Sequence, residues 1–94
     1  MIFGEIRELM LENQDIQQHI FRGDYSKRLI FAEDVIPRLA KKKGVSERSV
    51  EKDLEDALRY ASSLCYNLQG LSVMEFLVKE CRFVKSPNVK KSDL

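Results

Sequence analysis

Two helices joined by a tight turn form the most constraining pattern in this sequence. The run from Ile36 to Ala61, IPRLAKKKGVSERSVEKDLEDALRYA, reads as a short helix, a turn at Gly44 and a longer helix after Ser46. This order is typical of a helix-turn-helix, the unit that lays its second helix in the major groove of DNA. The run therefore predicts a helix-turn-helix over residues 36–61, with an ordinary helix hairpin as the alternative.

The motif has the residue types that its geometry requires. Ala40 is small enough for two helices to cross closely, and Gly44 can adopt the positive φ that the turn needs. We expect apolar anchors on both sides of the turn to fix the second helix against the first, namely Leu39, Val45, Val50 and Leu54.

The composition around the motif favours helices throughout. Charged residues make up 33% of the chain and hydrophobic residues 44%, and only four Gly and two Pro interrupt the 94 residues. We expect an all-α fold of four to five helices with the helix-turn-helix at its centre. The chain is short enough to be a single domain, which we place at residues 1–86, followed by a polar flexible tail at 87–94.

Periodicity and capping signals mark the first and last helices. Apolar residues recur every three or four positions over residues 2–21, which predicts an amphipathic helix ending before Gly23. His19, near its end, is interpreted as a surface or capping residue. The last helix begins with a capping box of Ser72 and Glu75 and is expected to continue until residues 86–88 stop it. Its expected buried face comprises Val73, Phe76, Leu77, Cys81 and Val84.

Pro37 stands inside the second apolar run, residues 29–40. Because proline disturbs a helix interior, we expect a break or kink near residues 34–36 and a fresh helix over 37–43. The alternative is one kinked helix over 28–43. The next helix begins after the N-cap Ser46 and ends between Ser62 and Asn67. Its expected buried stripe is Val50, Leu54, Ala57, Leu58, Ala61 and Leu64.

The exposed side of the second motif helix carries basic residues. On a helical wheel, Arg48, Lys52 and Arg59 lie opposite the apolar stripe. An arginine in the first turn can reach a guanine edge, while lysines and helix N-terminal amides can hold phosphates. The residues expected to contact DNA are therefore Lys41, Lys42, Lys43, Ser46, Glu47, Arg48, Ser49, Lys52 and Arg59.

Acidic residues on the same helix argue against strong DNA binding. The helix also contains Glu47, Glu51, Asp53, Glu55 and Asp56. Net charge is only +1, although residues 1–35 sum to −3 and residues 36–60 to +2. These charges predict weak, salt-dependent binding that needs two copies on one duplex. The alternative is a solvated helix whose charges pair with one another.

Two resemblances accompany the motif. The run GVSERSVEKDL resembles the start of the recognition helix of DeoR-type repressors, departing from it at Glu51 and Lys52. Residues 37–61 are similar to the DNA-binding effector domain of the sporulation master response regulator of endospore-forming bacteria. That resemblance implies an all-helical domain with a central helix-turn-helix. The chain lacks a receiver domain, and Ser62 stands where that family carries an aromatic residue. The matching positions are Pro37, Ala40, Lys41, Lys42, Val50, Glu51, Ala57 and Ala61.

The remaining chemistry-bearing residues give no catalytic or metal pattern. Cys65 and Cys81 lack partners at metal-ligand spacing, and we expect two reduced, buried thiols, with a disulfide as the alternative. No metal or other cofactor is expected, and the chain is not expected to be an enzyme. The tyrosines are interpreted as residues at the core edge, at positions Tyr25, Tyr60 and Tyr66.

The sequence thus favours a sequence-specific DNA-binding protein, a small transcriptional regulator acting as a homodimer. The first or the last helix would supply the dimer contact. The alternative is a helical module that binds another protein through the same exposed helix face. No apolar run is long enough for a membrane span and no signal peptide is recognised, so we expect a cytoplasmic location without membrane contact.

Overall fold

The computed structural model describes residues 2–86 and is all-helical over that range. Its elements are α1 (Ile2–Phe21), α2 (Ala32–Lys43), α3 (Glu47–Ser62), the 3₁₀ turn η1 (Tyr66–Leu68) and α4 (Val73–Lys79). The described residues contain no strand, so the predicted all-α class with four to five helices is confirmed. None of the described helices is long and apolar enough to cross a bilayer. The predicted tail at 87–94 lies outside the described residues.

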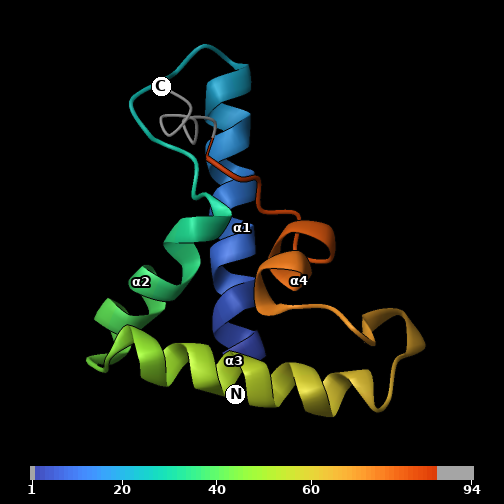
Figure 1. The fold of residues 1–94 in the computed structure, drawn as a ribbon. Helices are drawn as coiled ribbons and strands as arrows, with labels where there is room; N and C mark the ends of the chain where they lie inside the picture. The colour runs from blue at the N-terminus through green and yellow to red at the C-terminus, as the bar shows by residue number, and fades with distance from the viewer. Residues whose placement is uncertain (1, 87–94) are drawn as a thin grey trace, which may run out of the picture.

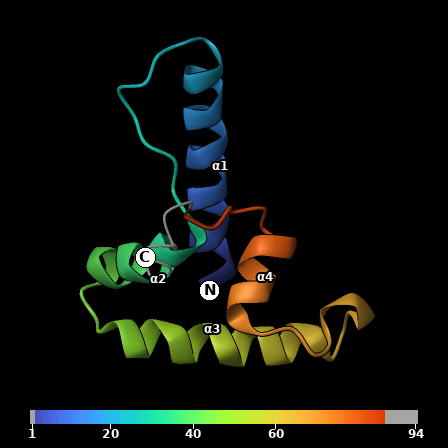
Figure 2. The same ribbon diagram turned by 45° about the horizontal axis from the view of Figure 1, so that its top comes forward.

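The helices are arranged around α1 (Figure 1). The N-terminal end of α1 meets α3, which runs across the base of the molecule, and α2 and α4 flank α1 on opposite sides (Figures 1 and 2). All four helices contribute to one apolar cluster. Its most deeply buried side chains are Ile6, Ile30, Val35, Leu39, Val50, Leu54, Leu77 and Phe83.

The first helix agrees with the sequence in both bounds and buried face. It spans Ile2–Phe21 and buries a single stripe of side chains against the other helices. After it, Gly23 adopts a φ of 92°, and the Asp24 N–H donates to the carbonyl of His19. A left-handed glycine is the usual way to end a helix, because no Cβ opposes that conformation.

Asn13 is the one polar side chain buried among the described residues, and it fastens the following loop to α1. Its Nδ2 donates to the Ile30 carbonyl at 3.2 Å, and its Oδ1 accepts from the Ile30 N–H at 2.8 Å. Both backbone groups of a fully buried residue are therefore satisfied by one amide side chain. These two bonds fix the position of Ile30, and with it the end of the loop of residues 22–31 that leads into α2.

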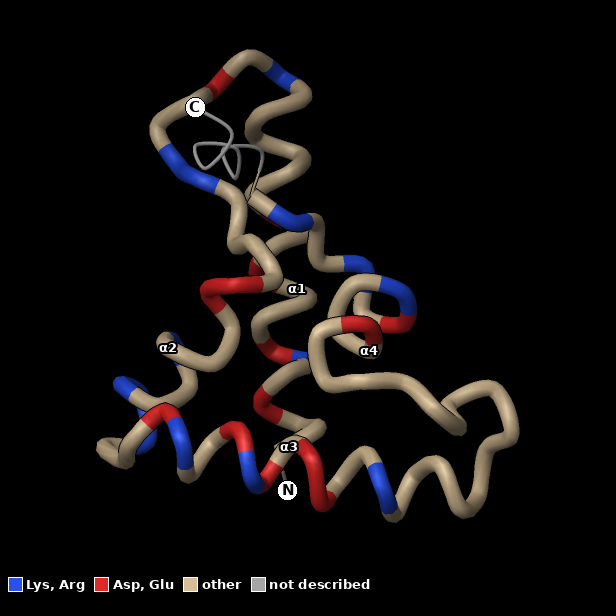
Figure 3. Tube along the Cα trace, viewed as in Figure 1, with Lys and Arg blue, Asp and Glu red and all other residues tan. Residues whose placement is uncertain are grey.

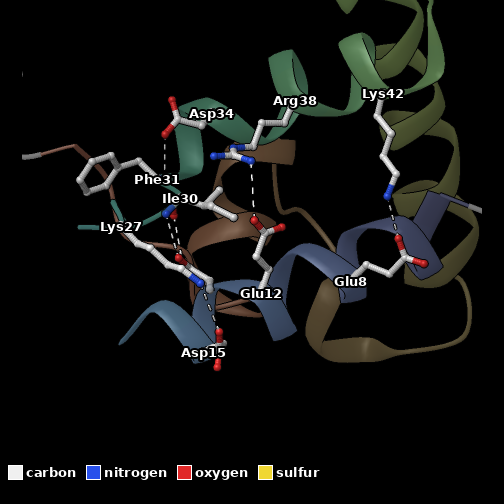
Figure 4. A network of polar contacts seen from close by, with 10 residues as sticks. Glu8, Glu12, Asp15, Lys27, Ile30, Phe31, Asp34, Arg38 and Lys42 are labelled. Atoms are coloured by element: carbon white, nitrogen blue, oxygen red, sulfur yellow. Dashed lines mark hydrogen bonds and ion pairs between the residues drawn. The ribbon is translucent and has the colours of Figure 1, made fainter. Parts of the chain in front are cut away.

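The predicted break near residues 34–36 is wrong. One helix, α2, runs from Ala32 to Lys43 with Pro37 inside it, and it begins later than the alternative start at residue 28. The Asp34 carboxylate accepts from the Phe31 N–H at 3.0 Å, which stabilises the first turn (Figure 4). Val35 and Leu39 are fully buried on either side of the proline. Tertiary packing therefore offsets the hydrogen bond that Pro37 cannot donate.

The turn between α2 and α3 has the predicted capping. Gly44 adopts φ 71° and ψ 33° as the C-cap of α2, and the Val45 N–H donates to the Ala40 carbonyl. Ser46 is the N-cap of α3, with its Oγ accepting from the Ser49 N–H at 3.1 Å. Three residues thus separate the two helices. Val45, predicted to be an anchor, is instead 41% exposed.

The C-terminal end of α3 lies at the first residue of its predicted range, but the predicted buried stripe is partly wrong. The helix ends at Ser62, so Leu64 falls beyond it and is exposed rather than buried, while Ala61 is half-buried. Cys65 is also exposed, against the expectation of two buried thiols, although both cysteines are free. The three tyrosines predicted at the core edge are exposed as well. Because α3 ends at Ser62, Leu64 no longer follows the buried side of the helix.

The last helix is shorter than expected. The capping box is confirmed, because Ser72 Oγ accepts from the Glu75 N–H and the Glu75 carboxylate accepts from the Ser72 N–H. The helix ends at Lys79, however, and Arg82 adopts a φ of 65°. Beyond that residue the chain is no longer helical; Phe83 is buried and Val84 is exposed, the reverse of the helical expectation. The Val84 carbonyl accepts from the Ala32 N–H, so this segment caps α2.

Candidate nucleic-acid interface

The helix α3 is buried on one side only. Val50, Leu54 and Leu58 pack into the core, and the opposite side of the helix faces solvent along its whole length. In both ribbon views α3 forms an outer edge of the molecule with no other helix beyond it (Figures 1 and 2). This is the disposition that a groove-binding helix requires.

Arg48 and Lys52 lie on the open side of α3 and are exposed. Over residues 2–86 neither of them forms an ion pair, so both can turn to an incoming anion. Glu51 and Glu55 line the same shallow hollow as these two cations. Basic and acidic residues are therefore interspersed along α3 (Figure 3).

Arg59 stands apart from these two cations. Its Nη1 lies 3.1 Å from Asp56 Oδ1 in the same helix, an i,i+3 pair on the exposed surface. A contact between Arg59 and DNA would therefore compete with Asp56.

The three lysines at the end of α2 differ in whether they form an ion pair. Lys42 Nζ lies 2.8 Å from Glu8 Oε1, and Lys43 Nζ lies 3.2 Å from Glu5 Oε1. The hydrogen bond to Lys42 lowers the pKa of Glu8, and the same bond raises the pKa of Lys42. Lys41 is exposed and forms no ion pair within the described part of the chain.

These pairs belong to a longer ladder between α1 and the basic segments that face it. Arg38 lies 4.0 Å from Glu12, and Lys27 lies 3.8 Å from Asp15 (Figure 4). The acids of α1 therefore face four cations in order along the helix, pairing Glu5 with Lys43, Glu8 with Lys42, Glu12 with Arg38 and Asp15 with Lys27. The negative first third of the chain partly neutralises the positive motif within the same molecule.

The start of α3 offers backbone donors. Ser46 Oγ satisfies the Ser49 N–H, while Glu47 and Arg48 occupy the first helical positions, whose N–H groups have no partner within the helix. Glu47 and Ser49 are both exposed. The positive end of the helix dipole thus lies beside Arg48, although Glu47 partly offsets it.

The structure therefore brings only part of the expected set together. Lys41, Ser46, Ser49, Arg48 and Lys52 are exposed around the turn and the first half of α3. Lys42, Lys43 and Arg59 are engaged by acids. The acids of α1 were missed in the sequence, because Glu8 and Lys42 are 34 positions apart and no local spacing connects them.

Comparisons with protein-family models, with curated proteins and with solved structures found no significant match to this chain.

Proposed function

We propose that this chain binds double-stranded DNA through α3, with Arg48 and Lys52 as the principal contacts. Arg48 in the first turn would read a base edge in the major groove, and Lys52 one turn later would contact a base or a phosphate. Lys41 and the amides at the start of α3 would hold the backbone at the lip of the groove. A small transcriptional regulator is the role that fits such a domain.

The open side of α3 supports this proposal most directly. Its two unpaired cations contrast with the five cations that pair with carboxylates elsewhere in residues 2–86: Lys27, Arg38, Lys42, Lys43 and Arg59. A side chain held in an ion pair must exchange that partner for a phosphate, whereas Arg48 and Lys52 need exchange only water. Like the unpaired Lys41, these two can therefore bind phosphate without breaking an ion pair.

Glu51 and Glu55 set the strength that we expect. They flank Lys52 on the same surface and would approach the phosphates with it. Their repulsion lowers affinity and makes binding depend steeply on ionic strength. We therefore expect one copy to bind weakly at physiological salt.

Fluorescence anisotropy with duplexes selected from a random pool tests the proposal. The double variant Arg48→Ala/Lys52→Ala should bind at least about tenfold more weakly, because neither position can then reach a base or a phosphate. The slope of log affinity against log salt concentration should also be less negative in this variant, by about one for each phosphate that the variant leaves unneutralised.

The matched control is Arg7→Ala/Arg22→Ala. Both arginines are exposed on or just after α1, and this variant changes the net charge by the same amount. Its affinity should stay within about twofold of the wild type, because screening weakens distant charges. Equal losses in the two double variants would reject α3 as the binding element, and so would a wild-type chain that binds no duplex at low salt.

A further inference from the structure

We propose that the corner formed by Tyr60, Leu64 and Tyr66 is the surface through which two copies of this chain associate. We call it the apolar corner. The three side chains are 64%, 73% and 83% exposed, respectively. They lie at the C-terminal end of α3 and in the turn that follows it, where the chain projects beyond α4 (Figures 1 and 2). This position differs from the first or last helix, which the sequence suggested for the dimer contact.

The first support is that three large exposed apolar residues fall within residues 60–66, at one end of α3. Single exposed hydrophobic residues are common on protein surfaces, but a group of them on one projection marks an interaction site. Leu64 follows α3 instead of packing beneath it, and Tyr66 opens η1 without reaching the core. Aromatic residues of this kind are enriched at protein interfaces.

The absence of charge at the corner indicates a second copy as the partner. Residues 60–74 contain no Asp, Glu, Lys or Arg in a chain that is 33% charged. A two-fold interface places the same patch against itself, so any charge near the axis meets a like charge. An uncharged patch is complementary to itself, whereas DNA or a charged peptide would require the opposite charge. The nearest charges in α3, Arg59 and Asp56, already neutralise each other.

The area of the corner predicts a weak, reversible dimer. Three large apolar side chains expose on the order of 500 Å² per copy, below the roughly 800 Å² per partner of a stable interface. Association should therefore occur from micromolar to millimolar concentration. The corner is at the opposite end of α3 from Arg48, so a dimer leaves the open side of α3 free, and the inference does not depend on DNA binding.

Sedimentation equilibrium of the full chain without DNA tests this inference. The wild type should associate across that concentration range. Leu64→Glu and Tyr66→Glu should each raise the dissociation constant at least about tenfold, since each puts like charges together across the axis.

Phe21→Glu is the matched control, because Phe21 is 92% exposed at the far end of α1 and the substitution adds the same charge. It should leave association unchanged. Far-UV circular dichroism verifies that every variant keeps its helices.

Cys65 supplies an independent readout, because it is exposed between Leu64 and Tyr66. A short bismaleimide, which adds one thiol at each end, should link wild-type chains into a covalent dimer. The yield of covalent dimer should fall in Leu64→Glu to the level expected from random collisions, and no dimer should form in Cys65→Ser.

A wild type that stays monomeric up to millimolar concentration would overturn the proposal. So would equal association in Leu64→Glu, Tyr66→Glu and Phe21→Glu, or cross-linking that is no faster in the wild type than in Leu64→Glu. None of these outcomes bears on whether α3 binds DNA, so failure of one proposal is distinguishable from failure of the other.

Discussion

Asn13 has the most consequential side chain in the core, because it satisfies both backbone groups of a buried residue. In the sequence, Asn13 follows the three- to four-residue spacing of the apolar residues in the first helix. Its partner could not be predicted, because Ile30 is 17 positions away in a segment without periodicity. The spacing thus identifies a buried polar residue, and only the tertiary structure explains why burial is tolerated.

Replacing this amide should destabilise the fold strongly. In Asn13→Ala the N–H and carbonyl of Ile30 remain buried without partners, so we expect a loss of about 2–4 kcal/mol in the free energy of unfolding. Urea denaturation measures it. Asn67→Ala, in the exposed turn η1, should change stability by less than about 0.5 kcal/mol. Equal stabilities of the two variants would show that the two bonds are not important.

The two cysteines should differ sharply in reactivity. Burial, and to a smaller degree the nearby Glu80, raises the pKa of the Cys81 thiol to about 11, whereas Cys65 is exposed. Because the thiolate is the reactive form, iodoacetamide at pH 8 should label one thiol per native chain, as counted by mass spectrometry. In Cys65→Ser the rapid labelling should disappear.

The same pKa predicts a loss of stability in alkali. The folded chain binds the Cys81 proton more tightly than the unfolded chain, so the contribution is complete below pH 9.0 and falls as pH rises towards 11. If iodoacetamide labelled Cys81 at pH 8 as fast as Cys65, the raised pKa of Cys81 that underlies both predictions would be contradicted.

At the scale of elements, helix boundaries that have a local capping signal could be predicted, and the others could not. The Ser46 and Ser72 caps and the Gly44 C-cap are local hydrogen-bonding patterns, and all three are confirmed. The early end of α4 and the continuity of α2 through Pro37 depend on contacts between distant segments. One example is the carbonyl of Val84, which caps α2 from the other end of the chain.

The short helix α4 should depend on its capping box. Ser72→Ala removes the acceptor for the Glu75 N–H and should cost about 1 kcal/mol of stability, measured by urea unfolding. Ser49→Ala, inside α3, has the same chemistry without a capping role and should be neutral or slightly stabilising. A larger destabilisation in Ser49→Ala would contradict the assignment.

Acid should weaken the same cap. The hydrogen bond from the Ser72 N–H lowers the pKa of Glu75, so the carboxylate stabilises the folded chain above its ordinary pKa of 4.5. That contribution is lost as pH falls through the lowered pKa, and it should be absent from the pH profile of Glu75→Gln.

The ion-pair ladder between α1 and α2 should restrain DNA binding. Glu8→Gln removes the carboxylate that engages Lys42 and frees this lysine for a phosphate. Affinity for DNA should then rise about two- to fivefold, in keeping with the modest strength of exposed pairs. Glu80→Gln adds the same charge at the end of α4 and should have a smaller effect in the same anisotropy assay. Equal increases would mean that only net charge matters.

For the molecule as a whole, the charge distribution has a different meaning from the one suggested by the sequence. In the sequence, the first 35 residues sum to −3 and residues 36–60 to +2. In the fold much of this contrast is internal, because α1 faces α2 and their charges pair (Figure 4). The positive charge that remains unpaired and open to a partner lies on the first half of α3. The apolar corner at the other end of α3 was not predicted, because the sequence assigned Leu64 to the core.

Chemical-shift mapping of the isotope-labelled chain during titration with a selected duplex tests the central proposal most directly. The proposal predicts that, at low salt, the largest amide shifts fall on residues 41–52, from the end of α2 through Lys52, and diminish as salt is added. Shifts confined to α1 or α4, or an unchanged spectrum at saturating duplex, would contradict it.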